Sequence, residues 1–209
     1  MSARLFSRKL PLVKRLFDLL LVIPGLVLIS PILAAVALAI WLSDGRPIFF
    51  RQSRPGYKGK IFKNIKFRTM RNLTERDGCN LPDSTRVTRL GRFLRSTSLD
   101  ELPELFNVLR GEMSLVGPRP LLVAYLDRYS SEQARRHDTL PGITGWAQIN
   151  GRNAISWEEK FRLDVWYVDH WSVGLDIWIL ALTFLKVIRR EGITPPGLEN
   201  VQEFMGTKD

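Results

Sequence analysis

Three stretches near the middle of the chain combine charged side chains with the glycine and proline residues of tight turns. They are Ser98–Glu104 (SLDELPE), Gly117–Pro120 (GPRP), and Pro141–Gly145 (PGITG) followed by Asn150–Asn153 (NGRN). The first contains two adjacent carboxylates, Asp100 and Glu101. Aspartate can attack a phosphoryl group to form an aspartyl phosphate, and its ordinary pKa of about 3.9 leaves it ionised at neutral pH without a base. The pattern indicates phosphoryl chemistry at Asp100.

A carboxylate that meets a phosphate needs positive charge around it. Two unit negative charges about 4 Å apart repel by about 4 kcal/mol at an effective dielectric constant of about 20. The side chains that can spread this charge, together with a divalent cation, are Lys66, Arg95, Arg119 and Arg152. Arginine suits the role because its planar fork binds phosphate through two hydrogen bonds. We therefore expect these four side chains to belong to one phosphate site.

The same carboxylates also fit a purely structural role, as caps of a helix. Ser98, with Glu101 three residues later, matches a capping box. In that frame Pro103 falls at the fifth helical position, where its ring clashes with an earlier carbonyl, so a start with Asp100 as N-cap is favoured. In either frame Asp100 and Glu101 lie at a helix amino terminus, which attracts phosphate. The spacing alone favours a capping role for Asp100 and Glu101, whereas the surrounding motifs favour a catalytic role.

The segment from Leu19 to Leu42 contains no charged residue and is long enough, as a helix, to cross a hydrocarbon core of about 30 Å. Pro24 and the pair Ser30-Pro31 interrupt it, because proline lacks an amide hydrogen and clashes with the preceding turn. Basic residues are dense on both flanks: Arg4, Arg8, Lys9, Lys14 and Arg15 before it, and Arg46, Arg51, Arg54, Lys58, Lys60, Lys63, Lys66, Arg68 and Arg71 after it. Since such flanks stay on the cytoplasmic side, we expect a re-entrant helix broken at Ser30-Pro31.

A single spanning helix is the alternative to the re-entrant one. A cleaved signal peptide is excluded, because Asp18 interrupts its apolar region and the positive charge that follows opposes translocation.

Periodicity and turn signals predict the remaining elements. Two β-prone runs, Ile48–Phe50 and Ile61–Phe67, flank a Pro-Gly turn and predict a β-hairpin. A polar loop is expected over 72–88, and helices are expected over 99–111, 121–129 and 157–167.

The apolar segment Trp171–Arg190 has an uncharged run too short to span a membrane. It either packs in the core or lies in the headgroup plane with Trp171 and Trp178 as anchors. The expected fold class is α+β, mainly α, with a membrane region over 1–45, a catalytic domain over 46–194 and a polar, loosely attached tail over 195–209.

Composition narrows the function classes. The 209 residues carry 31 Lys and Arg against 21 Asp and Glu, a net charge of +10, with a single cysteine and two histidines. A disulfide-stapled module and a Cys/His zinc site are therefore excluded. No nucleic-acid recognition module, Asp-x-Asp triplet, Walker A loop or G-x-G-x-x-G loop occurs. The positive charge is thus expected to serve an anionic membrane and a phosphorylated substrate, and no nucleic acid.

Seven motifs occur in one order along the chain. They are Lys14–Asp18 (KRLFD), Ser30-Pro31, Ile61–Lys63 (IFK) with Lys66–Met70 (KFRTM), Arg95–Asn107 (RSTSLDELPELFN), Ser114–Pro120 (SLVGPRP), Pro141–Asn150 (PGITGWAQIN) and Gly151–Asn153 (GRN). From about residue 10 to residue 190 the chain resembles the bacterial sugar transferases, which are monotopic polyprenol-phosphate phosphoglycosyl transferases.

This resemblance implies an enzyme on the cytoplasmic face of the bacterial inner membrane that uses Mg²⁺. It would transfer a phospho-sugar from a UDP-sugar to undecaprenyl phosphate in two steps and release UMP, with interfacial amphipathic helices around a cytoplasmic active site. By motif, Asp100 matches the nucleophile, and Glu101 matches the partner that assists the lipid phosphate and the metal. The resemblance assigns phosphate binding to Arg119, site charge to Lys66 and Arg95, a place near the nucleotide to Arg152, and the re-entrant break to Ser30-Pro31.

The resemblance is to the minimal catalytic form of the family, and residues 119–123 and 153–158 look most like the type that uses UDP-diacetylbacillosamine. N-acetylgalactosamine, N-acetylglucosamine and galactose donors stay open, as does the oligomeric state. Two other functions are considered: a membrane-docked nucleotide-sugar hydrolase using the same aspartate, and a non-enzymatic basic membrane adaptor. His137 and Asp138 could form a second site, although a buried structural pair is favoured.

Overall fold

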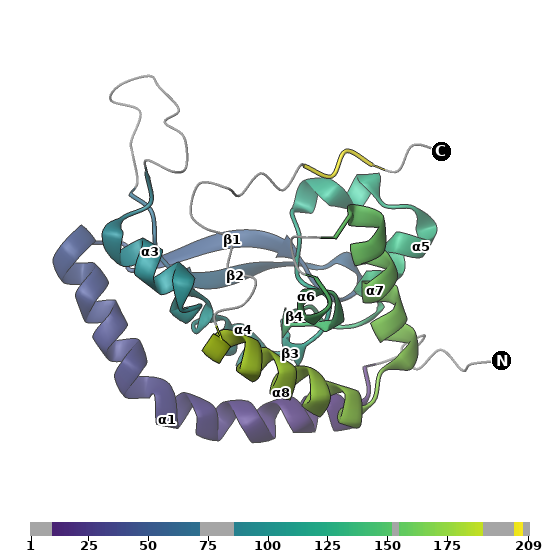
Figure 1. Cartoon of the computed structure of the whole chain (residues 1–209), viewed down its shortest axis with the longest axis horizontal. Helices are drawn as coiled ribbons and strands as arrows, with labels where there is room; N and C mark the ends of the chain where they lie inside the picture. Colours follow the sequence, from purple (N-terminus) through teal and green to yellow (C-terminus); the bar gives the residue numbers. More distant parts are fainter. Residues whose placement is uncertain (1–9, 72–85, 152–154, 190–202, 207–209) are drawn as a thin grey trace.

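Helices make up most of the described chain, and a β-hairpin is present, as the sequence predicts; a second small sheet was not predicted. The computed structural model describes residues 10–71, 86–151, 155–189 and 203–206 (Figure 1). The helices are α1 (Leu12–Asp44), α3 (Arg89–Ser96), α4 (Glu104–Arg110), α5 (Ser131–Ala134), α6 (Trp146–Ile149), α7 (Trp157–His170) and α8 (Val173–Arg189). The 3-10 turns are η1 (Tyr57–Gly59), η2 (Leu99–Glu101), η3 (Val123–Arg128) and η4 (Arg135–Asp138). The strands are β1 (Phe49–Pro55), β2 (Ile61–Phe67), β3 (Ser114–Val116) and β4 (Gly142–Thr144).

Helix α1 runs along one edge of the molecule and bends part way along its length (Figure 1). It is the one helix of the described chain that is long and apolar enough to cross a membrane, and most of its apolar side chains are exposed. Pro31 cannot donate to the carbonyl of Val27, four residues before it. The Ser30 hydroxyl donates to that same carbonyl at 2.8 Å, so the helix loses no hydrogen bond there. The predicted break is therefore a bend within one helix.

One face of the first turns of α1, which carries Lys14 and Asp18, is buried in the protein. The Lys14 ammonium, 1% exposed, donates to Asp176 Oδ2 of α8 at 2.7 Å and to the Tyr167 hydroxyl of α7 at 3.0 Å. Asp176 also accepts from the Tyr167 hydroxyl at 2.6 Å and from Trp171 Nε1 at 3.0 Å. We call Lys14, Tyr167, Trp171 and Asp176 the anchor cluster. It corrects the expectation that Lys14 belongs to the basic flank that faces the membrane.

Two neighbours of Lys14 on α1 also bind the rest of the fold. Asp18 Oδ1 accepts from the Ser114 hydroxyl and from the Leu115 amide of β3, each at 3.0 Å. Arg15 donates to the last carbonyls of α4, including that of Leu109 at 2.6 Å. The KRLFD motif thus attaches α1 to β3, α4 and α8.

The predicted hairpin is present, and it is tied to the other end of α1. β1 and β2 pair antiparallel, from Phe49 opposite Phe67 to Pro55 opposite Ile61. Arg68 follows β2 directly, and its guanidinium donates to the carbonyls of Asp44 at 2.5 Å, Gly45 at 2.8 Å and Arg46 at 3.0 Å. Because these carbonyls lie at the carboxyl end of α1, Arg68 satisfies groups that the helix leaves unpaired.

Three glycines let β3 and β4 meet backbone to backbone. The two strands are parallel, with Ser114 opposite Gly142 and Val116 opposite Thr144. A Cβ on Gly142 would lie 2.1 Å from the Gly117 nitrogen, and one on Gly145 would lie 2.2 Å from the Gly117 oxygen. No side chain fits at those distances, so the motifs SLVGPRP and PGITG interlock here. This contact fixes the path of the chain from β3 to Arg119.

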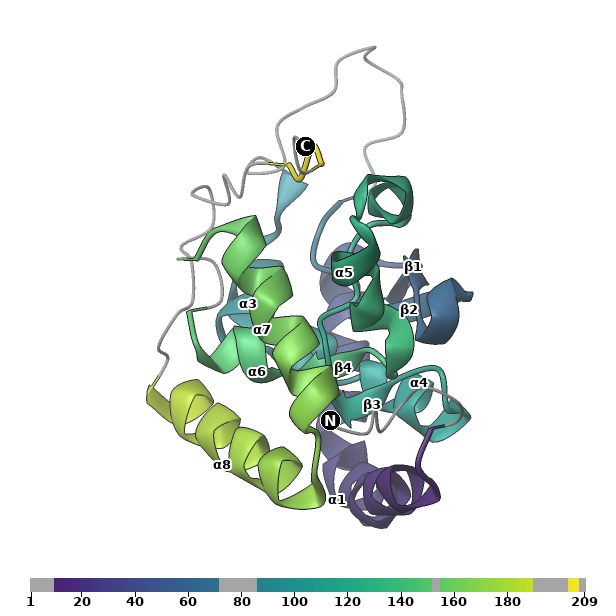
Figure 2. The same ribbon diagram turned by 90° about the vertical axis from the view of Figure 1, so that its right-hand side faces the viewer.

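The carboxyl-terminal part differs from expectation in two places. Phe204 is buried among aromatic rings that include Tyr125 and Phe161, so the tail is attached at 203–206 and the prediction of a loose tail is wrong there. Helix α8 buries Ile179 and Asp176 and exposes a second, apolar face made of Ile177, Trp178, Phe184, Leu185 and Val187. Helices α1 and α8 both lie along the lower edge of the molecule (Figures 1 and 2).

Candidate active site

Asp100 and Glu101 lie on η2, a single 3-10 turn between α3 and α4. Ser98 precedes this turn with a left-handed backbone (φ 56°), and its side chain makes no capping hydrogen bond. Helix α4 begins only at Glu104, with Pro103 at its N-cap position. Both predicted capping frames are therefore wrong, because Ser98 makes no capping hydrogen bond and α4 starts after the two carboxylates, with Pro103 rather than Asp100 at its N-cap position.

Glu101 is held by two cations from distant parts of the chain. Its Oε1 accepts from Lys66 Nζ of β2 at 2.5 Å and from Arg119 Nη2, beyond β3, at 2.7 Å. Burial alone would raise the pKa of Glu101, but the charges and hydrogen bonds of Arg119 and Lys66 outweigh it and hold that pKa far below its usual range. The structure thus brings Lys66 and Arg119 together at Glu101, and their role in binding phosphate stays a prediction.

A third carboxylate, Glu104, joins this group. Its Oε1 lies 3.2 Å from Lys66 Nζ and accepts from Asn64 Nδ2 at 3.0 Å. Burial, and secondarily the Glu101 charge, raises the pKa of Glu104, while Lys66 opposes the rise. We call Lys66, Glu101, Glu104 and Arg119 the reaction cluster. The sequence analysis missed Glu104, although its spacing of three from Glu101 places both carboxylates on one side of the turn.

Asp100 lies beside the reaction cluster. Burial, followed by the adjacent Glu101 carboxylate, raises the pKa of Asp100 to about 6, while the charges of Lys66, Arg95 and Arg119 oppose this rise. Arg95 comes from α3, and its Nε donates to the Thr69 hydroxyl at 3.0 Å. With a pKa of about 6, roughly nine in ten Asp100 side chains are ionised at pH 7. The arrangement places an anionic oxygen near three cationic side chains, which suits attack on a phosphorus atom.

The Asn107 side chain fixes α4 against β2, the strand that carries Lys66. Asn107 of α4 accepts from the Ile65 amide at 3.1 Å and donates to the Lys63 carbonyl at 2.8 Å. Both contacts are on β2, so they set the position of Lys66 relative to α4.

The oxygen ligands available to a magnesium ion are few. No group of three or more His, Cys, Asp and Glu side chains forms a metal site in the part of the chain that the structure describes. Both hydrogen bonds to Glu101 fall on Oε1. Magnesium commonly binds through one or two carboxylates plus substrate phosphates. Asp100 and Glu101 fit that pattern only if a diphosphate supplies further oxygens.

The other predicted site residues lie apart or outside the described residues. Arg152 falls in 152–154, which the structure does not describe, so its role stays a prediction. His137 and Asp138 do not pair with each other: His137 Nδ1 donates to the Gly56 carbonyl at 3.2 Å, and Asp138 pairs with Lys58. Burial, with a contribution from Arg136, lowers the pKa of His137 to about 4, so this buried side chain is neutral at pH 7.

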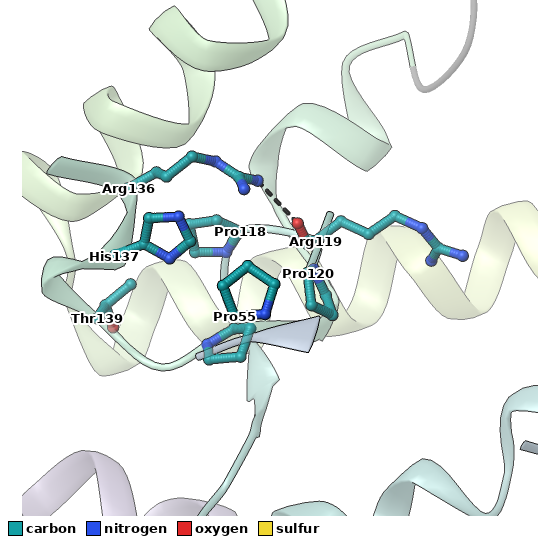
Figure 3. A pocket seen from close by; sticks show the side chains of 8 residues that line it. Pro55, Pro118, Arg119, Pro120, Arg136, His137 and Thr139 are labelled. Carbon is teal, nitrogen blue, oxygen red and sulfur yellow. Dashed lines mark hydrogen bonds between the residues drawn. The ribbon is translucent and has the colours of Figure 1, made fainter. Parts of the chain in front are cut away.

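Arg136 is a further residue that the sequence analysis missed. Its Nη2 donates to the Arg119 carbonyl at 2.7 Å, beside a pocket that four prolines line (Figure 3). It is 2% exposed and pairs with the buried Asp164 of α7. Nothing in the sequence distinguishes it from Arg135, which pairs with Glu132 and Asp169 nearer the surface.

Comparison with known proteins places this site in a family context. The sequence model for "bacterial sugar transferase" matches residues 9–190. A Bacillus subtilis relative named "uncharacterized sugar transferase EpsL" is 54% identical over 198 residues, which cover 95% of this chain and 98% of the relative. An Escherichia coli relative named "UDP-glucose:undecaprenyl-phosphate glucose-1-phosphate transferase" is 45% identical over 186 residues, which cover 84% of this chain and 40% of the relative.

A third relative, "galactosyl transferase CpsE" of Streptococcus agalactiae, is 43% identical over 189 residues, which cover 84% of this chain and 42% of the relative. The chain thus spans about two fifths of the length of these two longer relatives and nearly all of the Bacillus one.

Proposed function

The chain belongs to the bacterial sugar transferase family, and on that premise we propose that it transfers a phospho-sugar from a UDP-sugar to undecaprenyl phosphate and releases UMP. The name of the Escherichia coli relative supports this reaction class. The observation that carries the proposal is the placement of Asp100 beside the reaction cluster, under the charges of Lys66, Arg95 and Arg119. An anionic oxygen near cationic side chains is suited to accept a phosphoryl group.

In the first step, a carboxylate oxygen of Asp100 attacks the phosphorus that carries the sugar. The bond from that phosphorus to the bridging oxygen breaks, and the electron pair leaves with UMP. No proton needs to be removed from Asp100, because the carboxylate is already ionised at neutral pH. Lys66, Arg95 and Arg119 offset the charge that gathers on the transferred group.

In the second step, a phosphate oxygen of undecaprenyl phosphate attacks the same phosphorus. The bond between that phosphorus and the Asp100 oxygen breaks, and the free carboxylate is restored. The mixed anhydride on Asp100 retains much of the reactivity of the original diphosphate, so neither step requires a large input of free energy.

Glu101 acts in this account by holding Lys66 and Arg119 in place. Its strongly lowered pKa makes it a poor proton acceptor at neutral pH, because the ion pairs favour its charged form. Magnesium, bound by Asp100 and the unengaged oxygen of Glu101 together with the diphosphate, would supply further positive charge to the leaving phosphate.

We place the protein on the cytoplasmic face of the inner membrane, with α1 re-entrant and the exposed face of α8 in the headgroup plane. The apolar exposure of α1, its bend, and the basic residues on both sides of it support this placement. Ser2→Cys and Lys60→Cys, each in a Cys79→Ser background, test it by labelling intact cells. Both should stay unlabelled until the cells are permeabilised, and labelling of Ser2→Cys from outside would instead indicate a spanning helix.

The decisive assay measures UMP release with and without polyprenol phosphate. Transfer predicts lipid-dependent turnover and a lipid-linked sugar. UMP with free sugar phosphate and no lipid-linked sugar would support the hydrolase, no product at all would support the adaptor, and release of UDP would contradict both enzymes. The sugar panel should add glucose and galactose to the N-acetylated sugars, because relatives are named for both hexoses. Glucose was absent from the sequence-based expectation.

A further inference from the structure

Arg136 is buried at the back of the loop that carries Arg119. Its Nε and Nη2 lie 3.1 and 2.7 Å from Asp164 Oδ2. Its guanidinium carbon lies 5.8 Å from the Tyr129 ring centre and 5.7 Å from that of Phe161. An arginine with a fixed carboxylate on one side and two rings against it has little freedom to move.

This guanidinium also donates to the Tyr129 hydroxyl at 3.4 Å and to the Arg119 carbonyl at 2.7 Å. Pro118 and Pro120 flank Arg119, and their rings fix φ at both positions. Pro120 also keeps Arg119 out of the helical region and confines its ψ angle, so the φ angle of Arg119 and the ψ angle of Pro118 are the main freedoms left at this point of the loop. Rotation about either angle would turn the carbonyl that Arg136 binds.

The Arg119 side chain extends away from Arg136 (Figure 3), toward Glu101 Oε1 at 2.7 Å. The carbonyl and the side chain of Arg119 are therefore held from opposite sides, one by Arg136 and the other by the reaction cluster. A rotation of the loop that releases the carbonyl would also carry the guanidinium away from Asp100 and Glu101.

We propose that the buried Arg136–Asp164 pair is a positioning device for the transfer reaction, in which Arg136 fixes the Arg119 loop and Asp164 fixes Arg136. Neither residue touches the reacting atoms. The proposal rests on the proposed function, since it assigns Arg119 to the phosphate of the donor.

The test uses the double variant Arg136→Met/Asp164→Leu, because removing one partner alone would leave a buried charge unpaired and risk unfolding. Replacing both partners with apolar side chains commonly preserves stability. We expect a melting temperature near that of the wild type and a fall of about 30-fold in kcat for UMP release, since small misplacements of a catalytic group have effects of this size. Arg135→Gln, at the neighbouring position, is the matched control and should stay within about twofold of the wild type.

A double-mutant cycle separates positioning from general stability. In an Arg119→Ala background the Arg136→Met/Asp164→Leu change should lower kcat by less than about threefold, because the side chain that it positions is already absent. A full 30-fold loss in that background would overturn the proposal. Arg136→Lys is the second variant. A lysine at this position has no rigid fork to join Asp164 to the Arg119 carbonyl, so we expect a kcat below that of the wild type even though the positive charge is kept.

Amide hydrogen exchange tests the same inference without activity. In the double variant, exchange over 114–122 should quicken at least severalfold, while exchange over 12–22 of α1 stays unchanged. Equal exchange over 114–122 would contradict the proposal. Absence of lipid-dependent UMP release by the wild-type protein would refute the proposed function instead, and the exchange result would still decide whether Arg136 fixes the loop.

Discussion

The anchor cluster and the reaction cluster use the same chemical groups in two opposite ways. In the anchor cluster one lysine meets one aspartate, both side chains are 1% exposed, and Asp176 accepts hydrogen bonds from three donors. In the reaction cluster Lys66, Glu101 and Arg119 are 23%, 16% and 37% exposed. The first is closed and satisfied, whereas the second stays open to a ligand.

This difference distinguishes the charged side chains that stabilise the fold from those that can still bind a ligand. A buried pair with every donor satisfied fixes α1 to α8 and has no capacity left for a substrate. Asp100, in contrast, lies near three cations that act on it through their charge, with its pKa raised by burial. Partial exposure together with a perturbed pKa therefore marks Asp100 and its neighbours as the candidate reactive site.

The largest expected effect is on Asp100. Asp100→Asn removes the nucleophilic oxygen, so UMP release should fall by about 10³-fold or more, as for other covalent catalysts that lose their nucleophile. Because an ionised carboxylate with a raised pKa is unfavourable in the folded state at pH 7, the variant should be at least as stable as the wild type. Turnover within tenfold of the wild type would refute the nucleophile assignment.

Asp176→Asn should disrupt the anchor cluster. It should lower stability and leave activity nearly unchanged, which is the reverse of the effect expected for Asp100→Asn. It leaves the Lys14 ammonium buried without its anionic partner, which typically costs about 3–5 kcal/mol in the free energy of unfolding. Activity per folded molecule should stay within about threefold, measured at a temperature where the variant is folded.

The matched control is Asp169→Asn, whose Arg135 partner lies nearer the surface and whose loss should cost about 1 kcal/mol or less. Unchanged stability of Asp176→Asn, or loss of activity in fully folded protein, would mean that the two clusters are not separable in this way.

Glu101→Gln tests the reaction cluster without removing the nucleophile. The amide keeps the shape of the side chain but loses the charge that holds Lys66 and Arg119, so we expect a loss of about 100-fold in UMP release. The free energy of unfolding should also fall, because the strongly lowered pKa of Glu101 means that its charge stabilises the folded state at pH 7. An active and stable Glu101→Gln protein would contradict the partner role.

The pH dependence is the smallest predicted effect. Asp100 must be ionised to attack, so the rate of the first step should be level above pH 7 and fall about tenfold per unit below about pH 6. The contribution of Asp100 to stability should instead increase as the pH falls, because its raised pKa means that the folded state binds the proton more tightly than the unfolded state does. A rate that stays level down to pH 4 would show that Asp100 keeps its ordinary pKa.

Short, turn-rich motifs were enough to predict which charged residues gather around Asp100. Asp100, Glu101, Lys66, Arg95 and Arg119 were predicted from residue type and motif, and the structure brings them together. The local backbone was predicted less well, because a left-handed conformation is uncommon for a serine and nothing in the sequence marks it at Ser98.

The supporting contacts could not be predicted, because their partners are far apart in the chain. Lys14 meets Asp176 across 162 positions, and no pattern near either residue marks the other. For the same reason Lys14 and Arg15 were assigned to the membrane flank. Arg136 and Phe204 were missed because burial, not type or spacing, gives them their roles.

The most direct test of the account is to trap the intermediate. The protein is incubated with UDP-sugar and magnesium without polyprenol phosphate, quenched, digested and analysed by mass spectrometry. We predict one added phospho-sugar on the peptide that contains Asp100, one equivalent of UMP per enzyme, and loss of the adduct when polyprenol phosphate is added. Lipid-dependent UMP release with no adduct at Asp100, under quench conditions that preserve acyl phosphates, would contradict the two-step reaction.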